Sequence, residues 1–185
     1  MKRKIATAVL VLFGWAVFAS KAQAATTDNM TVTVTIGGAL DINLVEATYD
    51  FGSQGINITT VSATGVTAQN SSTALTEDWQ INASTFTANW NLTTAAPGPD
   101  TVRLSAQLAA VRPAVGGGTW SVFDILTSYQ NLTSSAFTDG TSNGNDVPAA
   151  GSRTLWFKLE TPTTTSSSNV QTLTVTVQAV VASTF

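Results

Sequence analysis

The segment from Asp139 to Asp146 carries side chains that could hold a metal ion. Oxygen donors occupy alternate positions at Asp139, Thr141 and Asn143, a glycine follows, and Asp146 closes the run. Calcium prefers several oxygen ligands, and a glycine lets a loop bend around the ion. The twelfth position, where the helix-loop-helix calcium motif has a glutamate, is Ala150. The sequence therefore predicts either a calcium site at these four residues or a solvated loop between strands.

Trp156 is a candidate ligand contact. It alternates out of phase with Leu155, Phe157 and Leu159, so it should point away from the core that those residues fill. An exposed tryptophan on a sheet can pack against the C–H face of a sugar ring. The alternative is that Trp156 packs in the core or against a second sheet.

Catalytic groups are scarce in the chain. Paired carboxylates can hydrolyse glycosidic bonds, but Glu77 and Asp78 are neighbours on a predicted strand and should point to opposite faces. The chain contains no histidine and no cysteine. This removes the His- and Cys-based nucleophile pairs and the usual ligands of zinc, copper, haem and iron–sulfur clusters. We therefore expect no enzymatic activity, and no cofactor unless calcium binds.

Apolar and polar residues alternate with a period of two along much of the chain. This pattern is typical of strands with one face on a core and one face in water. We expect Leu104, Phe157 and Val175 to be buried, and Arg103, Lys158 and Thr176 to be exposed. The clearest stretches are 31–36, 102–108, 155–159 and 173–179, and the positions 40, 42 and 44 continue the first of them.

Two regions depart from this alternation. In the first, 120–137, the residues 122–126 could form a single helical turn. The second, 161–168, is a low-complexity stretch rich in Thr and Ser. Because strand signals flank it, we interpret it as the loop of a hairpin that joins 155–159 to 173–179.

One part of the sequence resembles a known class of domain. Phe51-Gly52 follows an aromatic strand signal, Gly55 marks a turn, and a Thr-rich strand ends at Asn70 before the strand 78–81. This order resembles the opening of secreted bacterial surface proteins with immunoglobulin-like domains. The resemblance implies an all-β fold, a single immunoglobulin-like antiparallel β-sandwich, and it carries no functional residues over.

The first 24 residues have the three-part layout of a secretory signal peptide. A basic cluster at 2–4 precedes an uncharged, mostly apolar stretch from Ile5 to Ala19, and Ala22-Gln23-Ala24 offers small residues for cleavage. Cleavage would leave one domain, 25–185. We expect that domain to be secreted, to a periplasmic, extracellular or cell-surface location, without membrane insertion.

The predicted domain is poor in charge and acidic. It holds all eleven carboxylates of the chain but only four cations, so its net charge is −7. Scattered cations cannot neutralise a phosphate backbone, so nucleic acid is not an expected partner. The four cations are Arg103, Arg112, Arg153 and Lys158.

These observations together favour a secreted structural or adhesive cell-surface subunit. Its expected partners are copies of itself or other surface proteins, and a glycan is possible. Two alternatives stay open, a secreted carbohydrate-binding module and a small outer-membrane β-barrel.

The stretch from Asn29 to Ile36 is suited to assembly. Val32, Val34 and Ile36 give it one apolar face, and a Gly-Gly pair follows as a hinge. The stretch either forms the first strand of its own domain or adds to the open sheet edge of a neighbouring copy.

Export should remove residues 1–24, because the small residues at 22 and 24 fit the signal peptidase. Intact-mass measurement on exported protein checks this prediction. A mass that still includes Met1 to Ala24 would contradict it.

Overall fold

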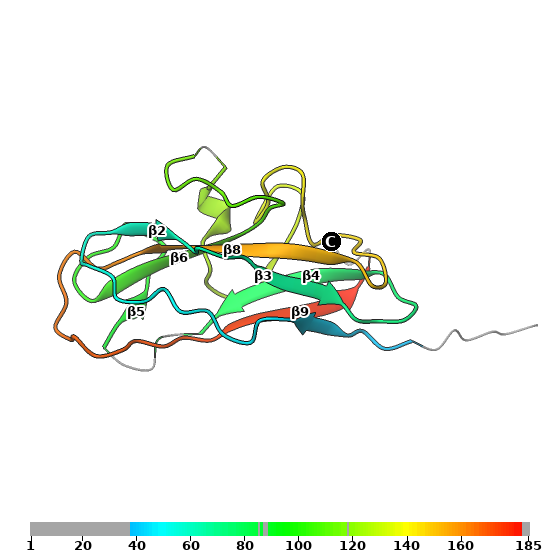
Figure 1. Ribbon diagram of the computed structural model, residues 1–185, viewed down its shortest axis with the longest axis horizontal. Coiled ribbons are helices and arrows are strands. Elements are labelled where there is room, and N and C mark those ends of the chain that lie inside the picture. The colour runs from blue at the N-terminus through cyan, green and yellow to red at the C-terminus, as the bar shows by residue number, and fades with distance from the viewer. Residues whose placement is uncertain (1–37, 85, 87–88, 118, 183–185) are drawn as a thin grey trace, which may run out of the picture. The chain divides into compact units, whose positions relative to one another are not determined.

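The computed structural model describes residues 38–84, 86, 89–117 and 119–182, which all belong to one compact unit. This part of the chain is all-β, with two sheets and one short 3-10 helix, η1 (Val122–Asp124) (Figure 1). It contains no helix with the length and apolar character of a membrane span. The predicted signal peptide and the stretch 29–36 lie outside the described residues.

The larger sheet has six strands, in the order β1-β3-β8-β6-β5, with β2 also paired to β8. Its strands are β1 (Ile42–Leu44), β2 (Thr59–Val61), β3 (Val66–Asn70), β5 (Asn91–Leu92), β6 (Thr101–Leu108) and β8 (Ser152–Glu160). The smaller sheet has the order β7-β4-β9, with β7 (Gln130–Asn131), β4 (Glu77–Ala83) and β9 (Val175–Val181).

Strand β8 organises the larger sheet, because β6 pairs along one of its edges and β2 and β3 share the other. Between β2 and β3, the four residues 62–65 lie opposite only Trp156 and Phe157, which makes a bulge of the β2–β3 edge. Gly65 is required there, because a Cβ on it would lie 2.2 Å from Cγ2 of Thr154 and 3.1 Å from the Trp156 ring. The bulge therefore lets the backbone pass close to a large side chain.

Strand β5 runs parallel to β6, with Asn91 opposite Thr101. The prediction of a wholly antiparallel sandwich is therefore wrong at this edge. The connection 93–100 does not reverse the chain in a tight turn. Instead it bonds to the loop after β8, where Asp100 N–H donates to Thr164 O (3.0 Å) and the Asp100 carboxylate accepts from Ser166 N–H (2.7 Å).

The hydrophobic core lies between the two sheets. Its largest buried side chain is Trp79 of β4, which packs in one cluster with residues of β3, β6 and β8. The prediction that Leu104 and Phe157 are buried is confirmed, since 4% and 7% of them are exposed. The alternating pattern determined these faces because one face of each strand meets the core. The prediction for β9 is wrong, because Val175, expected to be buried, and Thr176, expected to be exposed, are both half-buried.

Two other predictions have different outcomes. The helical turn predicted within 122–126 is confirmed as η1, whose N-cap is Ser121 and whose third residue, Asp124, completes a capping box. The hairpin predicted around 161–168 is wrong, because β8 and β9 lie in different sheets. The segment crosses from one sheet to the other.

Leu104→Ala should lower the free energy of unfolding by about 2–5 kcal/mol, because it removes buried methyl groups and leaves a cavity. Val122→Ala is the matched control and should change it by less than about 0.5 kcal/mol, because Val122 is 74% exposed. Urea denaturation measures both. Equal losses would contradict the placement of Leu104 in the core.

Candidate functional site

The four residues predicted to bind calcium lie in one loop between β7 and β8. Oδ1 of Asp139 accepts hydrogen bonds from Thr141 N–H (2.8 Å), Thr141 Oγ1 (2.7 Å) and Ser142 N–H (2.9 Å). Oδ1 of Asn143 accepts from Asn145 N–H (3.0 Å). Within the described ranges, no three Asp, Glu, His or Cys side chains gather in a way that could hold a metal ion. These side chains organise the loop, and calcium binding stays a prediction.

The hydrogen bonds that hold this loop also lower the pKa of the Asp139 carboxyl. Burial raises the pKa of this group, but hydrogen bonds from Thr141 and Ser142 and from the Ala110 backbone outweigh that effect, so the net pKa lies below its ordinary value. The loop therefore favours the ionised form of Asp139.

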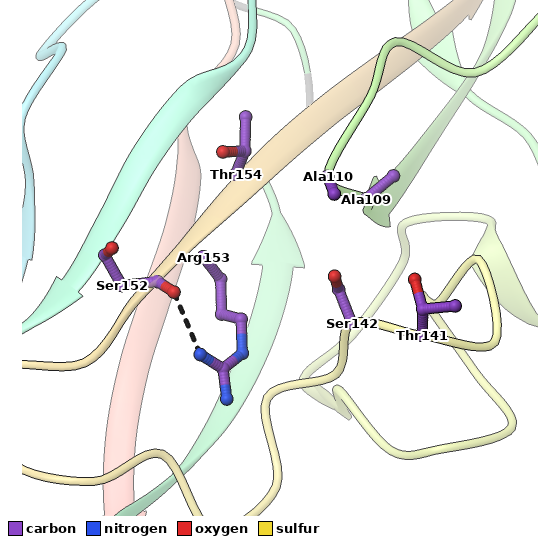
Figure 2. A pocket seen from close by; sticks show the side chains of 7 residues that line it. All are labelled: Ala109, Ala110, Thr141, Ser142, Ser152, Arg153 and Thr154. Carbon is purple, nitrogen blue, oxygen red and sulfur yellow. Dashed lines mark hydrogen bonds between the residues drawn. The ribbon is translucent and has the colours of Figure 1, made fainter.

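A hollow of about 540 Å³ lies beside this loop (Figure 2). It lies just past the end of β6, where Ala109 N–H donates to Thr154 O of β8 (3.0 Å). Figure 2 shows the hydroxyls of Thr141 and Ser142 directed toward Ala109 and Ala110. The lining residues are Ala109, Ala110, Thr141, Ser142, Ser152, Arg153 and Thr154.

Trp156 lies on the face of β8 opposite to Leu155 and Phe157, as its phase predicts. It is nevertheless buried, with 9% exposed, and its indole N–H donates to Ala109 O (3.0 Å). The bulge at Gly65 packs against its ring. The structure therefore places Trp156 under neighbouring backbone, where its ring cannot serve as a platform for a sugar.

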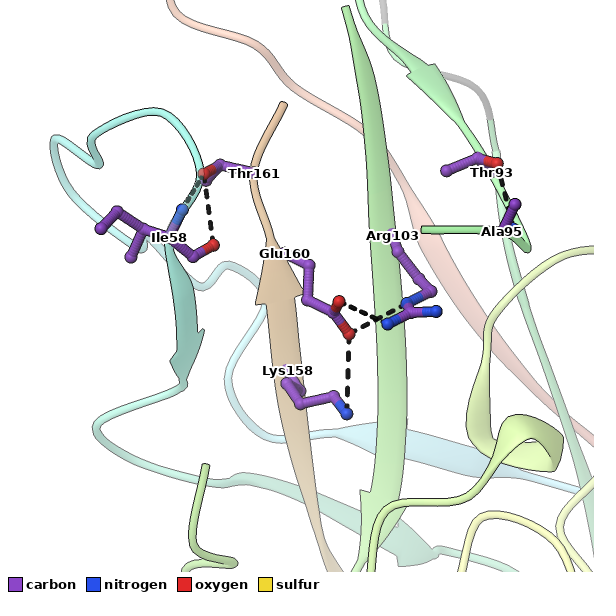
Figure 3. Close-up of polar contacts among 7 residues, drawn as sticks. All are labelled: Ile58, Thr93, Ala95, Arg103, Lys158, Glu160 and Thr161. Carbon is purple, nitrogen blue, oxygen red and sulfur yellow. Dashed lines mark hydrogen bonds and ion pairs between the residues drawn. The ribbon is translucent and has the colours of Figure 1, made fainter. Parts of the chain in front are cut away.

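Arg103 and Lys158, predicted to point to solvent, lie in a charged cluster on the outer face of the larger sheet (Figure 3). Arg103 Nε donates to Glu160 Oε1 (2.9 Å), and Lys158 Nζ lies 3.6 Å from the same oxygen. Lys158 Nζ also lies 5.0 Å from the centre of the Trp120 ring. Only 26% of the Arg103 side chain and 14% of the Lys158 side chain are exposed, so the prediction that they are solvated is wrong. The segment that carries Trp120 folds over this face, which the alternating pattern could not indicate.

Three carboxylates are buried, although the sequence did not indicate burial for any of them: Glu77, Asp78 and Asp124. Asp124 accepts from the N–H groups of Ser121 (2.7 Å) and Phe137 (2.6 Å) and so fixes the segment around η1. Burial raises the pKa of Asp124, and these bonds and the charge of Lys158 offset that rise only in part. The Ser-x-x-Asp capping spacing at 121–124 was the one signal that could have identified Asp124.

The edges of the two sheets come close together at β1 and β9. Within the described residues, β1 pairs only with β3 and β9 only with β4. The side chains that close the core here are only half-buried, unlike those of β6 and β8. They are Ile42, Leu44, Val175, Val177 and Ala179.

The direction of the backbone groups of β9 follows from its register with β4. Ser84 N–H donates to Thr174 O (2.8 Å), and antiparallel partners alternate between bonded and non-bonded pairs. Residues 176, 178 and 180 therefore bond to β4, whereas Val175, Val177 and Ala179 direct their backbone groups away from it. This edge, together with β1, is hereafter called the β1–β9 edge.

Comparison with protein-family models, with curated proteins and with solved structures gives no match for this chain.

The lowered pKa of Asp139 predicts a pH dependence. A carboxyl whose pKa is lower in the folded protein adds stability above its unfolded pKa and loses it as the pH falls. The stability difference between the wild type and Asp139→Asn should therefore shrink between about pH 5 and pH 2. Urea denaturation across this range measures it. A difference that stays constant with pH would contradict the assignment.

Proposed function

We propose that this protein is a secreted structural or adhesive subunit of a cell surface, and that its copies join by strand addition. In this proposal the stretch 29–36 of one copy adds to the β1–β9 edge of the next. The observation that carries the proposal is the half-buried apolar rim of that edge, beside backbone groups directed away from the sheet.

The two partners are chemically complementary. The edge offers N–H and C=O groups at alternate residues of β9, and an extended chain can satisfy them by adding a strand. Val32, Val34 and Ile36 supply the apolar side chains that would cover the half-buried rim. Burying apolar surface contributes about 25 cal/mol per Å², so the same contact would supply affinity.

The fold and location belong to the same proposal. The two sheets support a variant of the immunoglobulin-like sandwich in which the parallel strand β5 is a departure from the usual pattern. The residues 1–24 support secretion to a periplasmic, extracellular or surface location. We propose no catalytic role.

Assembly should depend on the donated strand and on the apolar character of one of its two faces. Mature protein, residues 25–185, should form linear oligomers, and Val34→Asp should abolish them by placing a charge in the apolar rim. Thr33→Asp is the matched control, because it changes the opposite face of the same strand, and it should still assemble. Size-exclusion chromatography and electron microscopy measure the outcome. A mature protein that stays monomeric at high concentration would refute the proposal.

The acceptor edge offers an independent test. Ala179→Pro should block assembly, because it removes an N–H directed to the open edge without removing a bond to β4. Ala179→Thr keeps the N–H and should assemble. Thermal melting checks that both variants fold. Equal assembly of the two would show that β9 is not the acceptor.

A deletion separates donation from the alternative in which 29–36 is a strand of its own domain. If the strand is donated, a chain without 25–36 keeps its fold and stops assembling. If that chain unfolds, the stretch belongs to its own domain and the proposal fails.

A further inference from the structure

The hollow between β6, β8 and the 139–146 loop contains a cation without an acidic partner. Arg153 Nε donates to Asn143 O (2.9 Å) and Nη1 donates to Ser152 O (2.9 Å). A guanidinium has five N–H donors, so these two carbonyls leave several donors for a ligand. Among the described residues, the salt bridges join only Arg103 and Lys158 to Glu160.

The other three cations of the domain have structural contacts. Arg103 and Lys158 lie against Glu160, and Arg112 donates to Ser62 O and Val61 O, both at 2.7 Å. Arg153 is the one of the four that lines the hollow.

The nearest acid does not cancel this positive charge by pairing with it. Oδ1 of Asp139 accepts three hydrogen bonds from Thr141 and Ser142, and the carboxylate also accepts from the Ala110 backbone, so it is bonded to residues of the lining and not to Arg153. The side of that loop which lines the hollow presents the Thr141 and Ser142 side chains (Figure 2). The lining thus combines a guanidinium with hydroxyl groups.

We propose that this hollow binds the carboxylate of an acidic sugar. The planar guanidinium fork of Arg153 matches a carboxylate in geometry and charge. The Ser142 hydroxyl can donate to or accept from the hydroxyls of the sugar, whereas Thr141 Oγ1, which donates to Asp139, can only accept. Ala109 and Ala110 present only methyl groups, so a ring can approach the backbone closely.

The net negative charge of the whole domain excludes ligands that carry many negative charges. A net charge of −7 repels a polyanion or a peptide with many acidic residues. One carboxylate on an otherwise neutral sugar gains the local contact with Arg153 and meets little of that repulsion. The ligand is therefore a glycan with an isolated uronic-acid unit. This site shares no residue with the β1–β9 edge, so it does not depend on strand addition.

The test is an NMR titration of mature protein, residues 25–185, with three small probes. Methyl glucuronide carries the carboxylate, methyl glucoside has a neutral CH2OH in its place, and acetate is a carboxylate without a sugar. The glucuronide should bind at least about tenfold more tightly than either of the other probes, which is the scale of one lost charge-assisted hydrogen bond. Shifts should be largest at Ala110, Ser142 and Arg153.

Variants assign the binding to this hollow. Arg153→Gln should reduce glucuronide binding to the level of the glucoside, and Ser142→Ala should weaken it while Arg153 is kept. Arg112→Gln removes a cation outside the hollow and should leave the affinity within about twofold, since charge alone is screened in solution. If Arg153→Gln does not fold, glucuronide binding is compared between the wild type and the variants Arg153→Lys and Ser142→Ala instead.

Three results would overturn the proposal. Equal binding of glucuronide and glucoside would show that the carboxylate is not recognised. Acetate, or a short Asp-Gly peptide, that binds as tightly as the glucuronide would show that the sugar is not recognised. Full affinity in both Ser142→Ala and an Arg153 variant would place any binding elsewhere.

Discussion

The buried carboxylate of Glu77 is the contact on which one end of this two-sheet fold depends. Oε1 accepts from Asp41 N–H (2.7 Å) just before β1, and Oε2 accepts from the indole N–H of Trp79 (3.1 Å) in the core. The adjacent carboxylate of Asp78 accepts from Asp146 N–H (2.7 Å). The chain has no cysteine, so these bonds take the place that disulfides have in many secreted domains. They join β4 of the smaller sheet to the chain just before β1 of the larger sheet, and to the 139–146 loop.

Other buried polar side chains also hydrogen-bond to the backbone of the connecting segments. Asn70 at the end of β3 donates to Leu75 O and Val147 O, both at 2.9 Å, and Gln107 of β6 donates to Thr119 O (2.6 Å) and Thr138 O (2.9 Å). Each side chain satisfies backbone groups of segments that make few ladder bonds. Buried amides and carboxylates thus hold the long connections in place.

The sequence predicted which residues face the core better than it predicted which strands are neighbours. The period of two in 102–108 and 155–159 gave the correct inward faces because burial of one face is a local property. It could not show that β8 pairs with β6 and not with β9, since pairing depends on contacts distant in the sequence. Prediction of the candidate site from the sequence was limited for the same reason. Spacing identified the 139–146 loop, but only the fold brings Arg153 beside it and buries Trp156.

The central position of β8 has a consequence for how the chain acquires its structure. Its partners β2, β3 and β6 all precede it in the sequence, and β4 likewise precedes its partner β9. During synthesis from the N-terminus, the pairs β1–β3, β5–β6 and β4–β7 can form early, but neither sheet is complete before β8 and β9 are made. Such late, long-range pairing makes folding slow and leaves strand edges unpaired in the meantime. A nascent chain that lacks 152–181 cannot build this architecture, so both sheets are completed only after these residues have been synthesised.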